Sequence, residues 1–179
     1  MLHRRRSMLA VAGAAGFATP AAGAHVALDA SSTTSQSVAE LLRRSEEANG
    51  ALLRGDVETY LSRITLSNDF TLMSPFGGTP SRGPYTSERW EEIGRFFRNG
   101  TLRQELVQAY GSADVVVLAL IEHGHGEVGG LPAQDWPLRV TLVYRREGLE
   151  WRLAHRHADP LVNGISLQQA ATLARSGTP

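Results

Sequence analysis

The stretch LRVTLVYRREGLEWRLAHRHAD, residues 138–159, decides the fold. Apolar and polar side chains alternate along residues 138–146 and again along residues 151–159, which is the period of a β-strand. Gly148 lies between the two runs and breaks the pattern. Because the connection is so short, the two strands are predicted to pair as an antiparallel hairpin.

More strands are predicted upstream of this hairpin. Period-two patterns run along residues 102–110 and 115–127, with Gly111 between them. A shorter strand around residues 70–74 ends at the sequence Pro-Phe-Gly-Gly of residues 75–78, which is a turn because Pro and two Gly cannot continue a ladder well.

Helices are predicted before and between these strands. Apolar side chains recur at helical spacing in residues 38–52, 57–64 and 87–97. Residues 37–40 form a capping box at the start of the first helix, and Asp56 can cap the second. This order predicts an α+β fold, with N-terminal helices packed on a curved, mainly antiparallel sheet.

Residues 1–24 have the features of a secretory signal peptide. Three arginines at positions 4–6 precede an apolar run at residues 8–19, and Ala22-Gly23-Ala24 offers small residues for cleavage. The pair Arg5-Arg6 and its surroundings resemble the twin-arginine export motif. We therefore expect an exported protein, periplasmic or secreted, with no stable membrane anchor, because the run is too short to span a bilayer. A disordered basic extension or a misassigned start codon is the alternative.

The rest of the 179-residue chain is expected to form one domain. Residues 25–36, rich in Ala, Ser and Thr, are predicted to be a flexible lead-in, residues 37–165 the folded domain, and residues 166–179 a C-terminal helix or tail. Without residues 1–24 the chain has 15 Arg against 18 acidic residues, a net charge of −3. This charge gives no electrostatic reason to bind nucleic acid, and the lack of Cys excludes disulfides and thiolate chemistry.

Three segments resemble the nuclear transport factor 2-like (NTF2-like) superfamily, and most closely its SnoaL-like branch. Residues 69–78 look like the first strand with its Pro-x-Gly turn. Residues 139–146 look like the penultimate strand, and residues 151–159 like the last, with Trp followed by His-x-His. The resemblance covers roughly residues 38–162. It implies a cone-shaped domain around a small-molecule pocket and a homodimer formed through the open face of the sheet.

His155 and His157 are the predicted catalytic residues. Alternate side chains of a strand share a face, so these two are expected to lie together with Trp151, Leu153 and Asp159. The resemblance implies that this face lines the pocket, where imidazole can donate, accept or carry a proton near neutral pH. The alternative is that both histidines make fixed hydrogen bonds within the sheet.

The neighbouring strands supply predicted ligand-binding residues at the same parity. Arg139 and Thr141 would face the pocket, and the guanidinium of Arg139 suits an anionic or carbonyl-bearing ligand. An ion pair of Arg139 with Glu127 or Asp159 is the alternative. His123 is a further candidate, although it could also lie at an exposed strand end.

Tyr60, Trp90 and Ser74 complete the predicted pocket. Tyr60 and Trp90 could form walls or simply belong to the core. Ser74, just before the turn, and Thr141 stand roughly where ketosteroid isomerase, which shares the resembled fold, has its two carboxyl groups. Serine and threonine do not ionise usefully near pH 7, so that mechanism is not carried over and a proton-abstracting reaction would need a histidine base.

His and acidic residues recur at alternate positions in residues 123–127 and 155–159, a pattern that could hold a metal ion. Imidazole and carboxylate suit zinc or iron, but the spacing does not match the cupin motif. We predict no metal and no cofactor.

Two functions remain open from the sequence. The first is a non-catalytic module that binds a small molecule or serves in assembly, which the missing carboxyl groups favour. The second is an isomerase- or cyclase-type enzyme acting on a small carbonyl or polycyclic compound through a histidine base. The resembled fold hosts both kinds of protein, so it does not decide between them.

Overall fold

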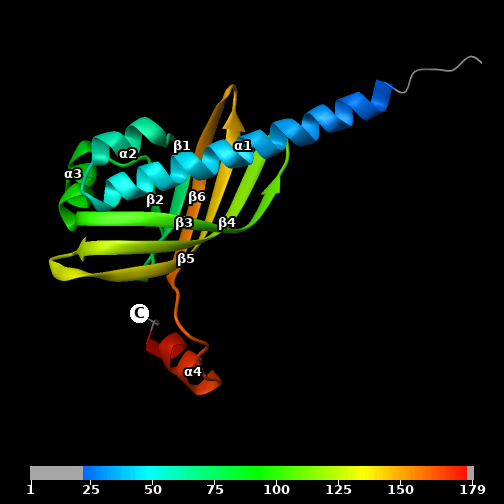
Figure 1. Ribbon diagram of the computed structural model, residues 1–179. Coiled ribbons are helices and arrows are strands. Elements are labelled where there is room, and N and C mark those ends of the chain that lie inside the picture. Colours follow the sequence, from blue (N-terminus) through cyan, green and yellow to red (C-terminus); the bar gives the residue numbers. More distant parts are fainter. Residues whose placement is uncertain (1–21, 177–179) are drawn as a thin grey trace, which may run out of the picture.

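The computed structural model describes residues 22–176 and arranges them as helices packed on one six-stranded sheet (Figure 1). Helices α1 (Ala22–Leu53), α2 (Val57–Arg63) and α3 (Ser87–Phe96) cover one face of the sheet, and helix α4 (Leu167–Ser176) follows the last strand. The predicted α+β architecture is confirmed.

The sheet has the strand order β2-β1-β6-β5-β4-β3. Its strands are β1 (Leu66–Met73), β2 (Ser81–Arg82), β3 (Phe97–Gly111), β4 (Val115–Val128), β5 (Leu131–Glu147) and β6 (Glu150–Pro160). β1 pairs with β6 in parallel, and the other pairs are antiparallel. The predicted hairpin is present as β5–β6, with Glu147 opposite Glu150 at its turn.

Helix α1 is longer than predicted. Residues 25–36, expected to be a flexible lead-in, are helical and continuous with the predicted helix, so residue 37 lies inside α1 rather than at its start. Residues 24–49 contain no Gly or Pro that would interrupt the helix. The C-terminal half of α1 buries Leu41, Ala48 and Ala51.

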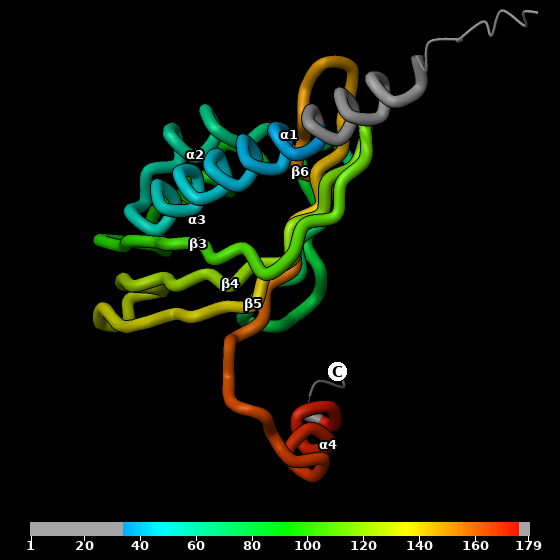
Figure 2. Tube along the Cα trace, turned by 45° about the vertical axis from the view of Figure 1, so that its right-hand side comes forward, coloured from blue at the N-terminus to red at the C-terminus, as the bar shows by residue number. Residues whose placement is uncertain are grey.

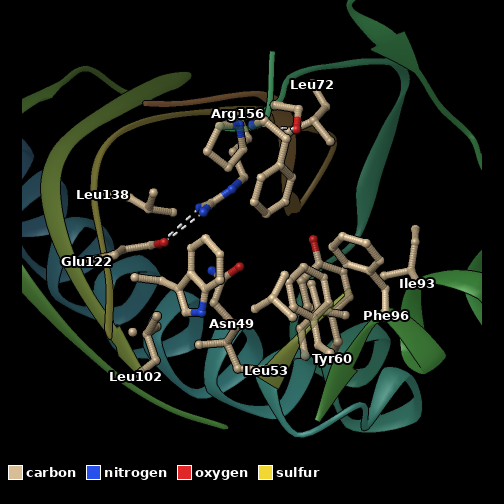
Figure 3. Close-up of a pocket in the computed structure, with 18 of the residues that line it drawn as sticks. Asn49, Leu53, Tyr60, Leu72, Ile93, Phe96, Leu102, Glu122, Leu138 and Arg156 are labelled. Carbon is tan, nitrogen blue, oxygen red and sulfur yellow. Dashed lines mark hydrogen bonds and ion pairs between the residues drawn. The ribbon is translucent and has the colours of Figure 1, made fainter. Parts of the chain in front are cut away.

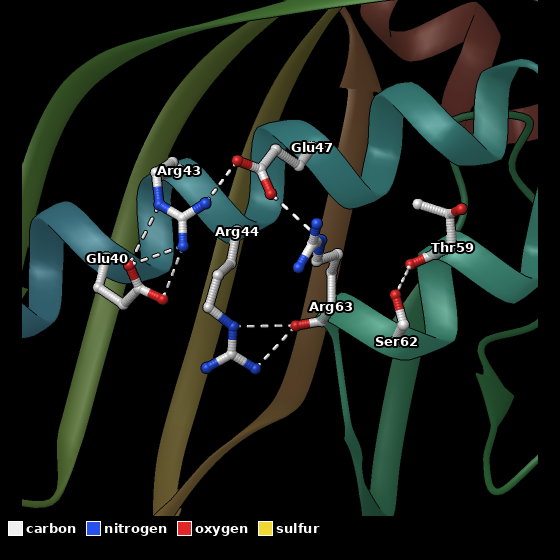
Figure 4. A network of polar contacts seen from close by, with 7 residues as sticks. All are labelled: Glu40, Arg43, Arg44, Glu47, Thr59, Ser62 and Arg63. Atoms are coloured by element: carbon white, nitrogen blue, oxygen red, sulfur yellow. Dashed lines mark hydrogen bonds and ion pairs between the residues drawn. The ribbon is translucent and has the colours of Figure 1, made fainter.

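A tight connection joins α1 to α2. Gly55 has φ +83°, and a Cβ there would lie 2.7 Å from the carbonyl oxygen of Gly94, so the chain needs glycine at this point. Asp56 then caps α2 as predicted, accepting a hydrogen bond of 2.9 Å from the backbone N–H of Thr59. At the other end of α2, Arg44 of α1 donates two hydrogen bonds, of 2.9 and 2.7 Å, to the carbonyl oxygen of Arg63 (Figure 4).

The strands present an inner face to α1–α3 and an outer face away from them. On β4 the inner residues Val116, Leu118 and Leu120 are buried. On β6 the alternation is interrupted, because Val143 pairs with His155 but the next residue, Tyr144, pairs with Leu153. Residue 154 is therefore an extra residue, a β-bulge, and it changes which later side chains of β6 face inward.

The last described helix lies away from the sheet (Figure 2). Helix α4 is set apart from the body and joined to β6 by residues 161–166 (Figure 2). No helix among residues 22–176 combines the length and the apolar character needed to cross a membrane. The predicted signal peptide, residues 1–24, falls almost wholly outside the described residues.

Candidate functional site

A cavity of about 360 Å³ lies between the helices and the inner face of the sheet (Figure 3). Most of its lining is apolar, including Leu53, Leu72, Ile93, Leu102 and Leu138. α1, α2 and α3 contribute one wall, and strands β1 and β3–β6 contribute the other. Such a hollow, mostly apolar with a few polar groups, is the usual form of a small-molecule site.

A buried ion pair forms part of the cavity wall. Arg156 of β6 donates from Nη1 to Oε1 of Glu122 at 2.9 Å and from Nη2 to Oε2 at 2.7 Å, which is a bidentate pair. Glu122 is 1% exposed, and the side chain of Arg156 is 15% exposed. Both residues point inward, because Glu122 has the parity of the buried Leu120 on β4 and Arg156 pairs in the register with the buried Leu142 of β5.

The pair holds Glu122 as a carboxylate. Burial alone would raise the pKa of Glu122, but the charge and hydrogen bonds of Arg156 and the hydrogen bond from Gln104 outweigh burial, so its pKa lies below the ordinary value. Burial acts to lower the pKa of Arg156, and Glu122 more than offsets this. A carboxylate with a lowered pKa is a weak base, so Glu122 is poorly suited to removing a proton from a bound molecule.

Hydrogen bonds connect this pair to helix α1. Gln104 Nε2 donates to Glu122 Oε1 and to Ser45 Oγ, both at 2.9 Å. Asn49 Nδ2 donates to the backbone oxygen of Ser45 at 2.9 Å. This bond directs the other atom of the Asn49 amide, Oδ1, away from the helix backbone, and Asn49 lines the cavity.

Three aromatic side chains that contact one another line the cavity next to the surface, with Phe76 in the middle. Phe76, which is 54% exposed, lies in the Pro-Phe-Gly-Gly turn, where Gly77 and Gly78 adopt φ +75° and +83°. Its ring makes edge contacts with Phe96 of α3 at 5.7 Å and with Trp136 of β5 at 6.1 Å between centroids. The predicted turn therefore places an aromatic ring at the cavity mouth.

Comparisons with solved structures classify this architecture. A candidate dehydratase of the NTF2-like family from Streptomyces avermitilis superposes with a TM-score of 0.59 at 18% identity, over 73% of this chain and 99% of that one. The fold is NTF2-like. A candidate ketosteroid isomerase from Shewanella frigidimarina gives a TM-score of 0.53 at 18% identity, over 67% and 94% of the two chains. The association domain of C. elegans CaMKII gives 0.52 at 14% identity, over 71% and 98%. No protein-family model and no curated protein matches the sequence.

Three of the residues predicted for the pocket line the cavity of this NTF2-like fold: Tyr60, Trp90 and Ser74. The rings of Tyr60 and Trp90 lie 5.5 Å apart, and Trp90 also contacts Tyr85 at 5.3 Å. Burial raises the pKa of Tyr60, so its hydroxyl stays protonated.

The other predicted residues do not line the cavity, so their predicted inward orientation is wrong. His155 and His157 lie on the outer face, where His155 Nδ1 contacts the hydroxyl of Thr71 at 2.7 Å and His157 Nε2 lies 3.4 Å from Asp159. The β-bulge at residue 154 is the reason, because Leu153 faces inward and the alternation then resumes with Arg156 inward. His155 instead makes a hydrogen bond within the sheet, to Thr71 of the neighbouring strand, which is the alternative given for it above.

Thr141, Arg139 and His123 also lie on the outer face, at the parity opposite to the buried residues of β4 and β5. Arg139 lies 3.8 Å from Asp159, which is one of the ion pairs that the sequence left open. His123 Nε2 lies 3.3 Å from Glu105. In the described part of the chain, no three ligating side chains are arranged to hold a metal ion.

Sequence reasoning missed Glu122, Arg156 and Asn49. Glu122 carried a conditional signal: it continues the parity of Leu118 and Leu120 in an apolar run, so it is buried if that parity faces the helices. A charged residue at a position otherwise occupied by buried leucines requires a partner of opposite charge. Arg156 has no such signal, because its inward orientation depends on the bulge.

Proposed function

We propose that this protein binds a small, mostly apolar molecule in the cavity without changing it chemically. One observation carries the proposal: most side chains that line the cavity are apolar, and the buried carboxylate in its wall, Glu122, is held by Arg156 rather than free to act as a base. Among the described residues, no histidine lines the cavity.

A binding experiment with an apolar dye tests this proposal. Nile red, which fluoresces in apolar surroundings, should bind saturably to the wild-type protein. Leu138→Trp should reduce binding strongly, because the larger ring occupies the cavity. Leu149→Trp is the matched control, since Leu149 is 91% exposed in the β5–β6 turn. Equal dye binding by both variants would show that the cavity is not the binding site. Mass spectrometry of molecules that co-purify with the protein would then identify the natural ligand.

Catalysis is the second candidate, because the compared structures include proteins named after a dehydratase and a ketosteroid isomerase. In this chain the proton transfer would fall to Glu122, the buried carboxylate in the cavity wall, since Glu92 is largely exposed. Turnover of an identified ligand that is lost in Glu122→Gln, while binding is retained, would support an enzyme and overturn the binding-only proposal.

We also propose a homodimer formed through the outer face of the sheet. Val117, Ala119 and Ile121 of β4 give this face an apolar strip, and one of the compared structures is an association domain. Light scattering should give twice the chain mass for the wild type and the chain mass for Ile121→Arg. Leu149→Arg should remain dimeric. A monomeric wild type at tens of micromolar would contradict the proposal.

We further propose that the protein is exported, on the basis of residues 1–24. N-terminal sequencing of the protein from its native host, with fractionation of the cells, tests this proposal. An intact N-terminus in the cytoplasm would contradict it, and loss of export in Arg5→Lys/Arg6→Lys would indicate the twin-arginine route.

A further inference from the structure

The charged groups that line the cavity cancel in pairs. Glu122 and Arg156 neutralise each other in the wall, and Arg89 and Glu92 form an exposed pair of 2.7 Å on α3. No other charged residue lines the cavity among the described residues. A bound anion would therefore add one uncompensated negative charge in surroundings that hold little water, beside the carboxylate of Glu122.

The same wall still offers hydrogen-bond donors. A guanidinium has five N–H groups, and Arg156 uses two of them on Glu122. In the described part of the chain, the remaining N–H groups of Arg156 have no protein partner, and Arg156 lines the cavity. A neutral oxygen, such as a carbonyl, can accept from these groups without adding charge.

One acceptor lies in the same hydrogen-bonded network. Asn49 is 7% exposed and lines the cavity, and its Oδ1 has no hydrogen-bond partner among the described residues. Asn49 is connected to Glu122 through Ser45 and Gln104, so it belongs to the polar part of the wall. Figure 3 shows Asn49, Glu122 and Arg156 around the cavity. Donors from Arg156 and an acceptor from Asn49 match a group that both accepts and donates.

We propose that the cavity selects neutral ligands with a hydrogen-bond acceptor, above all amides, over carboxylates of the same shape. The inference rests on the proposed binding function. An amide oxygen would accept from Arg156, and an amide N–H would donate to Asn49 Oδ1. A carboxylate of the same shape would meet Glu122 with like charge and would give Asn49 no donor.

The compounds 2-naphthamide and 2-naphthoate provide the test, because they share one apolar ring system and differ in the polar group. Competition with Nile red at pH 7 should give an affinity for 2-naphthamide at least 10-fold higher than for 2-naphthoate, which corresponds to about 1.4 kcal/mol. Equal or tighter binding of 2-naphthoate would overturn the inference while leaving the binding function intact. If neither compound displaces the dye and unsubstituted naphthalene does not either, the proposed binding function itself fails.

The variant Glu122→Gln tests the cause of the selectivity. It removes the negative charge and leaves Arg156 unpaired, so the ratio of the affinity for 2-naphthoate to that for 2-naphthamide should rise at least 10-fold. An unchanged ratio of affinities would overturn the inference. If circular dichroism shows that Glu122→Gln does not fold, a pH titration of ligand binding to the wild type tests whether ligand charge sets the selectivity. As the pH falls toward the ordinary carboxyl pKa of about 4, 2-naphthoate becomes neutral and must bind more tightly, whereas 2-naphthamide must not.

Discussion

Removing Arg156 should be among the most destabilising single changes in this protein. Arg156→Met deletes the hydrogen bonds of 2.9 and 2.7 Å to Glu122 and leaves a carboxylate that is 1% exposed with only the hydrogen bond from Gln104. Breaking a buried ion pair by removing one partner costs about 3–5 kcal/mol. Glu122→Leu should cost somewhat less, because Arg156 is 15% exposed and its charge can turn toward the cavity.

The double variant Glu122→Leu/Arg156→Met should be close to the wild type in stability. Both charges are then gone, and residues of similar volume fill the space, an exchange that is often neutral. We expect the double variant to lie within about 1 kcal/mol of the wild type, which implies a coupling energy of about 3 kcal/mol or more between the two positions. Urea unfolding followed by tryptophan fluorescence measures each free energy.

The Arg89–Glu92 pair on α3 is the matched control. It has the same residue types and the same shortest distance, 2.7 Å, but its side chains are 57% and 55% exposed. Coupling between such exposed helix neighbours is about 0.2–0.5 kcal/mol. If the two pairs show equal coupling, or if the buried pair couples by less than about 1 kcal/mol, burial does not set the strength of the Glu122–Arg156 pair and the reasoning is refuted.

The deficit of Arg156→Met should also depend on pH. Without Arg156, burial is left to raise the folded-state pKa of Glu122 above its unfolded value of 4.5. A group with a raised folded-state pKa contributes stability at low pH that is lost as the pH rises. The variant should therefore be further below the wild type at pH 7 than at pH 5. The same deficit at both pH values would contradict this assignment.

Three further predictions concern stability at acidic pH, the Phe76 side chain at the cavity and the connection between α1 and α2. In the wild type the pKa of Glu122 lies below 4.5, so the stability that its ionised form contributes is present above that pH and is lost below it. Between pH 5 and 3 the free energy of unfolding, measured with urea, should therefore fall less for Glu122→Gln than for the wild type. Equal falls would contradict the depressed pKa. Phe76→Ala should speed Nile red release in stopped-flow measurements with little change in thermal stability, because Phe76 is half exposed at the mouth; an unchanged release rate would show that the ring does not obstruct exit. Gly55→Ala should lower the free energy of unfolding in urea by about 1–3 kcal/mol. Gly148→Ala is the control and should lower it less. Gly55 and Gly148 both have positive φ, but only a Cβ at residue 55 would meet backbone atoms.

Helices and strands could be predicted from local sequence where the period of the apolar residues and the Gly residues that end it indicate the same element. β4 was predicted at residues 115–127 and is observed at Val115–Val128, because it begins with the apolar residues 115–121 and lies between Gly111 and Gly129. The cap at Asp56 was predictable for the same reason, as it depends on residues close in sequence. The error at residues 25–36 arose where composition was the only guide and no Gly or Pro marked a boundary.

The face of each strand was not predictable in the same way. Residues 115–121 of β4 are all apolar, so both parities fit a buried face, and the sequence alone does not decide which one the helices cover. Val116, Leu118 and Leu120 are buried, so Glu122, which has the same parity, faces inward and His123 faces outward. The face of β4 that is buried depends on how α1 packs against the sheet, which is a long-range contact that no local sequence pattern predicts.

A single extra residue in β6 sets the chemistry of the cavity wall. In the sequence His155-Arg156-His157, alternation places either the two imidazoles or the guanidinium on the inner face. With the bulge at residue 154, the inward residue is Arg156, a permanent cation that requires the buried carboxylate of Glu122 beside it. Inward imidazoles would have given a proton carrier near neutral pH. The bulge therefore favours a neutralised wall suited to holding a ligand over one suited to moving protons.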